Sequence, residues 1–307
     1  MNGNGILIRW VKALALAPIA ILVLALSDAG TPEPQVAKPT PPSELTVDDS
    51  FAPKISTPAF SAGKGPRIAV DEHHRNVVSL SSYFGPVGRF LQRDGYRVRP
   101  WTQAFEPSAL KDVRVLVIAN AQAPAGAETK ASAFTAGEIR ALERWVTGGG
   151  GLLLIADRAP FGGPAQALAN ALGVKLDDNT VLIKGPDGKP TGELSLTAES
   201  EGDAAHPIFS GVVRLVYVVG ESLGGPGVIL RAPKGAYSGP TAQATDGPTV
   251  AGKPLALAFA HGKGRMVVIG DAGIASAFGS VNGAAHRGIS EADNANFVRN
   301  VVRWLAR

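Results

Sequence analysis

The fold class follows from one stretch, "FTAGEIRALERWVTGGGGLLLIAD", at residues 134–157. Thr135 and Glu138 have the spacing of a capping box, in which two side chains satisfy free backbone amides at the start of a helix. Apolar residues at helical intervals follow, and a run of glycines at 148–151 ends the pattern. "LLLIAD" is then apolar up to its last residue, as expected of a central parallel strand covered on both faces. A helix that leads directly into such a strand indicates an α/β protein.

The same alternation extends in both directions along the chain. Strands are expected at 68–70, 96–99, 113–121, 255–260 and 266–270, and helices at 79–95, 164–173 and 290–306. Because such alternation implies right-handed crossovers, we predict a flavodoxin-like three-layer sandwich with a mostly parallel sheet. Short apolar runs between glycine- and proline-rich turns at 174–253 predict an inserted, irregular, β-rich extension.

The composition excludes several classes of function. The chain has 307 residues and a net charge of +4, and its basic residues are scattered, which argues against a nucleic-acid surface. The chain contains no cysteine, which rules out disulfides, thiolate zinc sites, a cysteine nucleophile and a lipoprotein anchor. Neither a G-x-G-x-x-G motif nor a P-loop is present, so no nucleotide cofactor is predicted.

The first 66 residues predict export and a linker. Arg9 and Lys12 precede an apolar run at 13–26, which is shorter than the roughly 20 residues of a typical membrane-spanning helix. Residues 1–29 therefore form either a cleaved signal peptide or an N-terminal membrane anchor, and an uncleaved segment would contact the membrane. Either alternative places the protein in the periplasm, or anchored and facing it. Residues 30–66 are rich in proline and predict a disordered linker, so the folded domain is expected at 67–307.

Polar side chains follow the predicted strands at the edge where open parallel sheets bind ligands. "DEHH" follows the first strand, and an asparagine or aspartate follows three of the others. We expect a ligand-binding rim made of Asp71, Glu72, His73, Asn76, Asn120, Asp157 and Asp271. The alternative is structural, because Asp and Asn at strand ends also cap helices and bind loop amides. No metal site is predicted, since His73 and His74 are adjacent and would point to opposite faces of a strand.

Several segments carry a resemblance to a known family. They are "IAVDEHHRN", "LQRDGYRV", the stretch at 134–157, "HPIFSGV", "GKGRMVVIGDAGIASAF" and "DNANFVRNVVRWL". Together they resemble the DUF4350 family of the class I glutamine amidotransferase-like superfamily, which is related to GldG-like and ThuA-like domains. That family more usually has an alanine between the acidic residue and the histidine.

The resemblance implies a flavodoxin-like sandwich without amidotransferase activity, because that activity needs a cysteine. Asp71, Glu72, His73 and Asn76 match motif positions to which no role is attached. Family members are often envelope proteins, and some are encoded near MoxR-type AAA ATPases, which implies a possible partner.

Two functions remain open from the sequence. The first is a non-catalytic binding or scaffold domain exposed in the envelope, with an envelope protein or a small polar ligand as partner. The second is a hydrolase of a carbohydrate or other small polar substrate. In that case Asp71, Glu72 or His73 would act as acid or base, while Asn120, Asp157 and Asp271 would position the substrate. A pocket that holds a carboxylate with a strongly shifted pKa would favour the enzyme.

Overall fold

A seven-stranded sheet forms the centre of the domain in the computed structural model, which describes residues 45–280 and 287–307. The strand order is β12-β14-β15-β5-β4-β2-β3. Its strands are β2 (Arg67–Asp71), β3 (Arg97–Trp101), β4 (Val115–Ala119), β5 (Gly151–Ile155), β12 (Val228–Arg231), β14 (Pro254–His261) and β15 (Gly264–Ile269). Six of these seven strands run in the same direction, and β14 is antiparallel to both of its neighbours. The predicted α/β fold with a mostly parallel sheet is confirmed.

The order of the strands creates a crevice at one edge. From β2 the chain crosses to β3 on one side and then returns to β4 on the other side of β2. Ligands of open α/β sheets bind beyond the carboxyl ends of the strands near such a reversal. The predicted rim residues follow β2, β4, β5 and β15, which all end at this edge.

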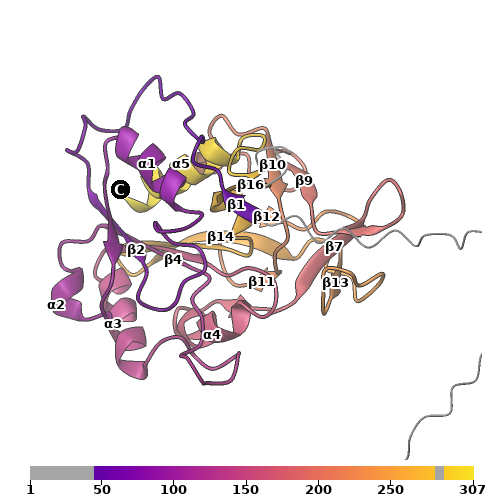
Figure 1. Ribbon diagram of the computed structural model, residues 1–307, viewed down its shortest axis with the longest axis horizontal. Helices are drawn as coiled ribbons and strands as arrows, with labels where there is room; N and C mark the ends of the chain where they lie inside the picture. The colour runs from indigo at the N-terminus through magenta and orange to yellow at the C-terminus, as the bar shows by residue number, and fades with distance from the viewer. Residues whose placement is uncertain (1–44, 281–286) are drawn as a thin grey trace, which may run out of the picture. The chain divides into compact units, whose positions relative to one another are not determined.

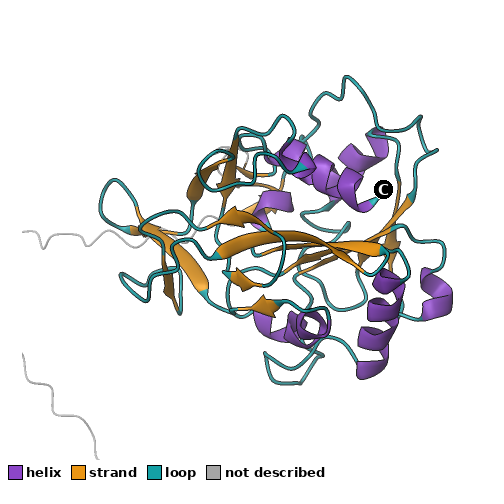
Figure 2. Cartoon of the chain, turned by 180° about the vertical axis from the view of Figure 1, so that it is seen from behind, coloured by secondary structure: helices purple, strands orange, loops and turns teal. Residues whose placement is uncertain are grey.

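Helices cover both faces of the sheet. Figure 1 shows α1 (Gly85–Arg93) and α5 (Asn294–Leu305) above it, and α2 (Pro107–Leu110), α3 (Ala136–Thr147) and α4 (Gly162–Ala171) below it. The same layers are seen from behind in Figure 2. Thr135 and Glu138 begin α3 with the predicted capping box. This arrangement confirms the three-layer sandwich.

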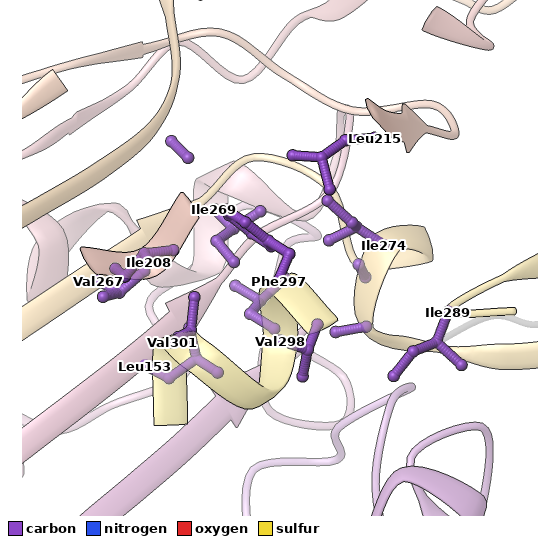
Figure 3. Packing of buried hydrophobic residues seen from close by; sticks show 14 of the residues in the cluster. Leu153, Ile208, Leu215, Val267, Ile269, Ile274, Ile289, Phe297, Val298 and Val301 are labelled. Atoms are coloured by element: carbon purple, nitrogen blue, oxygen red, sulfur yellow. The ribbon is translucent and has the colours of Figure 1, made fainter. Parts of the chain in front are cut away.

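Alternating side chains of β5 belong to two separate cores. Leu153 and Ile155 pack in the core that contains α1 and α5, whereas Leu152 and Leu154 pack in the core that contains α3 and α4. Figure 3 shows the first core, where Phe297 and Val301 of α5 lie near Leu153. Neighbouring residues of a strand point to opposite faces, so an uninterrupted apolar run is needed where both faces are covered.

The predicted β-rich extension is present, but one of its strands belongs to the main sheet. β12 pairs with β14 and covers the edge of the sheet, which would otherwise leave backbone groups unpaired. The other strands form small antiparallel sheets: β6 (Lys175–Leu176) with β11 (Leu223–Gly224), β9 (Leu194–Thr197) with β10 (Arg214–Tyr217), and β7 (Thr180–Lys184) with β8 (Pro190–Thr191) and β13 (Tyr237–Gly239). Two short 3₁₀ helices are also present. In chain order, η1 (Pro207–Phe209) lies between β9 and β10, and η2 (Gly273–Ala275) lies between β15 and β16.

The expected linker at 30–66 is wrong for residues 45–66. β1 (Leu45–Val47) pairs with β16 (Ala277–Ser280), which also pairs with β17 (Arg287–Gly288). Phe51 is buried against Phe90, and Phe60 contacts the edge of the Tyr96 ring. The segment packs through scattered aromatic side chains and backbone hydrogen bonds. Such contacts leave no regular hydrophobic period in the sequence, so the sequence predicted a linker here. The predicted signal or anchor at 1–29 and linker residues 30–44 lie outside the described residues. Within the described part, no helix is both long and apolar enough to cross a membrane.

Candidate functional site

A cavity of about 850 Å³ opens at the carboxyl edge of the sheet. Three of its lining residues follow central strands: Asn120 after β4, Asp157 after β5 and Asp271 after β15. Aromatic side chains, among them Tyr83 and Phe161, form part of its wall. Leu45 of β1 also lines it, and the Tyr83 hydroxyl donates to the Leu45 carbonyl at 3.3 Å. The cavity therefore lies where the strand order predicts a ligand site.

Asn120 organises the ends of two strands. Its backbone has a φ of +48°, a left-handed conformation that asparagine tolerates better than most residues. Its Oδ1 accepts the Asp157 amide at 2.9 Å, and its carbonyl accepts the Val77 amide at 3.2 Å. The Asn120 side-chain amide also hydrogen-bonds the Asp157 carboxyl, so the two polar side chains meet at the cavity wall.

Asp271 is fully buried and acts as a backbone acceptor. Its carboxylate accepts the amides of Val218 at 2.7 Å, Gly273 at 2.6 Å and Ile274 at 3.3 Å. Burial raises the pKa of Asp271 to about 6, against the effect of these hydrogen bonds. The three amides hold the β10 end and η2 together, so Asp271 serves the structural role that the sequence left open.

Asp157 has a different environment. It is partly exposed to the cavity, and its Oδ1 accepts the adjacent Arg158 amide at 2.7 Å. Burial and then the charge of Asp271 raise the pKa of Asp157 to about 8. The Arg158 amide, the Arg158 charge and the Asn120 side chain oppose this rise but do not outweigh it. At neutral pH this carboxyl is mostly protonated and can donate a hydrogen bond or a proton.

The "DEHH" segment does not form one site. Asp71 and His74 are buried on the α3 side of the sheet, where His74 Nδ1 lies 2.9 Å from Asp71 Oδ2 and Nε2 lies 3.0 Å from Glu138 Oε1. Phe105 stacks on the imidazole, and Phe134 tilts against it. Burial disfavours the charged form of His74, but the hydrogen bonds and charges of Asp71 and Glu138 outweigh it and raise its pKa. This cluster is enclosed and does not line the cavity.

The other predicted residues of this segment also lie outside the cavity lining. Glu72 Oε1 accepts the Ser81 amide at 3.0 Å, and His73 is exposed. Asn76 Nδ2 donates to the Ala119 carbonyl at 3.1 Å. The structure therefore does not bring Asp71, Glu72 and His73 together at the cavity, because they form a buried ion pair, a loop contact and an exposed ring. Their role as acid or base stays a prediction.

Sequence reasoning overlooked Arg158 and Glu221. Arg158 lines the cavity directly after Asp157. Glu221 is fully buried in the extension, accepts the Asp178 amide at 2.5 Å, and has a pKa raised well above its usual value, chiefly by burial. The position of Arg158 after a strand end was a usable signal, whereas nothing local marks Glu221 as buried. No three His, Asp or Glu side chains of the described chain come close enough together to hold a metal ion.

Comparison with known proteins supports the fold. No family model and no curated protein matches this chain. It is similar to the mmIFT52 N-terminal domain, with a TM-score of 0.58 and 15% identity over 78% of this chain and 97% of that domain. At this identity the likeness shows the fold alone.

Two further neighbours have lower scores. A ThuA-like protein from Bacteroides uniformis has a TM-score of 0.43 and 15% identity, covering 83% of this chain and 94% of that one. A GMP synthase-like protein from Thermoplasma acidophilum has a TM-score of 0.40 and 13% identity, covering 79% and 94%. The resemblance to the DUF4350 family and its superfamily stays a prediction.

Proposed function

We propose that the domain binds a small polar ligand, without turnover, in the cavity at the carboxyl edge of the sheet. The observation that carries this proposal is that the polar side chains of Asn120, Asp157 and Arg158 converge on the wall of one concave cavity. Ligand sites typically combine a concave apolar wall with a few convergent polar groups, in volumes of roughly 300–1,000 Å³. The cavity matches this description in position, size and lining.

Thermal unfolding of the full-length protein tests the proposal. The protein is scanned against a panel of sugars, polyols and organic acids, as wild type, as Asp157→Ala and as the double variant Glu72→Ala/His73→Ala. A cavity ligand raises the midpoint of the wild type and of the double variant but not of Asp157→Ala. The opposite pattern, with the response lost only in the double variant, would move the site to the "DEHH" segment.

A hydrolase is the second candidate, with Asp157 in place of the "DEHH" residues. The observation that favours it is the raised pKa of Asp157 inside a cavity, which is the state of a general acid at neutral pH. The test is turnover of chromogenic glycosides and esters by wild type and Asp157→Asn. Turnover that Asp157→Asn abolishes would replace the binding proposal by an enzymatic one.

We further propose that the domain is exposed in the envelope as a member of the DUF4350 family. The charged start, the apolar run at 13–26 and the quoted family segments support this proposal. Fractionation of cells that produce the tagged full chain, with and without residues 1–29, tests the location. Reciprocal co-purification with a MoxR-type ATPase tests the partner that the family resemblance implies.

A further inference from the structure

Two arginines line the cavity, and only one of them is neutralised by the protein. Arg287 forms an ion pair with Glu193, and both residues line the cavity. Arg158 lines it as well, but within the described residues its guanidinium has no hydrogen bond and no ion pair. A guanidinium that is held in a concave site without an anionic partner is a ready binding group for an anion.

The neighbouring carboxyl groups form no ion pair with Arg158 among the described residues, although the Arg158 charge acts to lower the pKa of Asp157. Both carboxylate oxygens of Asp271 are occupied by backbone amides. Asp157 is mostly protonated at neutral pH because of burial and the charge of Asp271. Within the described residues, the cavity therefore presents one guanidinium without an ion pair, beside the polar side chains of Asn120 and Asp157.

We propose that the ligand of this cavity is a small organic acid with a hydroxylated carbon skeleton, whose carboxylate binds Arg158. The inference rests on the proposed polar-ligand function and names its chemistry. A single unpaired guanidinium matches a monoanionic carboxylate, which it binds through two parallel hydrogen bonds. Asn120 and Asp157 then contact hydroxyl groups, while the side chains of Tyr83 and Phe161 cover the carbon skeleton.

A phosphorylated ligand is less well matched. Phosphate sites commonly use the free amides at a helix N-terminus, and α4 begins beside the cavity. However, a β-carbon on Gly162, the first residue of α4, would lie 2.8 Å from Glu221 Oε2. The start of α4 therefore faces a buried acidic side chain rather than an open anion site.

Three probes of one skeleton separate these chemistries: D-glucuronate, D-glucose and D-glucose 6-phosphate. Their binding to the full-length protein is measured by calorimetry at neutral pH, for wild type, Arg158→Gln and Arg140→Gln. Arg140 is an exposed residue of α3 outside the cavity lining, so Arg140→Gln removes the same charge elsewhere. D-glucuronate is expected to bind wild type and Arg140→Gln at least tenfold more tightly than Arg158→Gln, because a charged hydrogen-bonded contact is lost.

The remaining outcomes overturn the inference in distinguishable ways. Equal affinity for D-glucose and D-glucuronate, or D-glucuronate binding that Arg158→Gln retains, would remove the carboxylate contact and leave the polar-ligand function standing. Binding of D-glucose 6-phosphate alone would replace the carboxylate by a phosphate. If none of the three probes binds the wild type, the sugar-acid assignment fails, and the wider ligand panel alone decides the proposed function.

Discussion

His74 Nε2 lies 3.0 Å from Glu138 Oε1, and both side chains are buried. This contact joins the loop after β2 to the first turn of α3. Glu138 also accepts the amides of Phe105 and Thr135, at 3.2 and 3.0 Å. The Glu138 carboxylate thus completes the cap of α3, holds the loop at Phe105 and pairs with the buried His74 imidazole. The "DEHH" segment, which contains His74, therefore stabilises the fold.

We expect Glu138→Gln to lower the free energy of unfolding by about 3 kcal/mol, because it removes one of the two carboxylates that pair with the buried His74 imidazole. The matched control is Glu143→Gln on the same helix, where the described residues offer the side chain no hydrogen bond or ion pair. The control should change stability by no more than about 0.5 kcal/mol. Urea unfolding measures both variants, and equal effects would contradict the role of Glu138.

The raised pKa of His74 predicts a specific pH dependence. A histidine whose folded pKa exceeds its unfolded value of about 6.5 stabilises the fold in its protonated form. Its contribution is complete below pH 6.5 and is lost as the pH rises through the folded pKa. The difference in unfolding free energy between wild type and His74→Gln should therefore be largest in mild acid and shrink toward alkaline pH. A difference that stays constant from pH 5 to 9 would show that folding does not shift the pKa of His74.

Asp157 and Asp271 should respond in opposite ways to the same substitution. Asp271→Asn removes one acceptor oxygen that buried backbone amides need, which should cost about 1–3 kcal/mol. The amide introduced by Asp157→Asn is uncharged, as the protonated carboxyl of Asp157 is. Because the folded pKa of Asp157 is raised from 3.8 to about 8, its burial reduces stability increasingly as the pH rises across this interval. Asp157→Asn should therefore gain stability relative to wild type between pH 4 and 8, as thermal unfolding can measure. Equal losses of stability in Asp157→Asn and Asp271→Asn would contradict the different roles of these two carboxyl groups.

Asp94 should anchor the segment at 45–66. It is fully buried and accepts the Arg299 guanidinium at 2.7 Å, the Arg303 guanidinium at 3.0 Å and the Ala59 amide at 2.8 Å. Asp94→Asn should cost about 3–5 kcal/mol and make this segment sensitive to protease. The exposed pair between Asp49 and Arg89 provides the control, since Asp49→Asn should cost less than about 1 kcal/mol.

The stabilisation by Asp94 should also depend on pH. Burial opposes its charge, but the two arginines and the Ala59 amide outweigh burial and lower its pKa below 3.8. Its contribution is present above pH 3.8 and is lost as the pH falls through the folded pKa. Wild type and Asp94→Asn should therefore converge in strong acid, and a constant difference down to pH 2 would contradict the ion pairs.

Local sequence determined the elements of this protein. The capping box of Thr135 and Glu138, the apolar run at 152–155 and the spacing in the last helix each specify a conformation within a few residues, so the α/β sandwich could be predicted. The edge at which Asn120, Asp157 and Asp271 gather could be predicted too, because parallel strands end on the same side.

Tertiary structure alone decided what each polar residue does. Asp157 and Asp271 both follow apolar strands, yet Asp271 is occupied by the amide of distant Val218 together with two amides of its own loop, whereas Asp157 faces a cavity. Likewise, Glu138, which pairs with His74, stands 64 residues away in the chain, and the Thr57 carbonyl is held by Arg299 of α5. The pKa and the exposure of a side chain depend on which groups surround it in space, and those contacts exist only after the chain has folded.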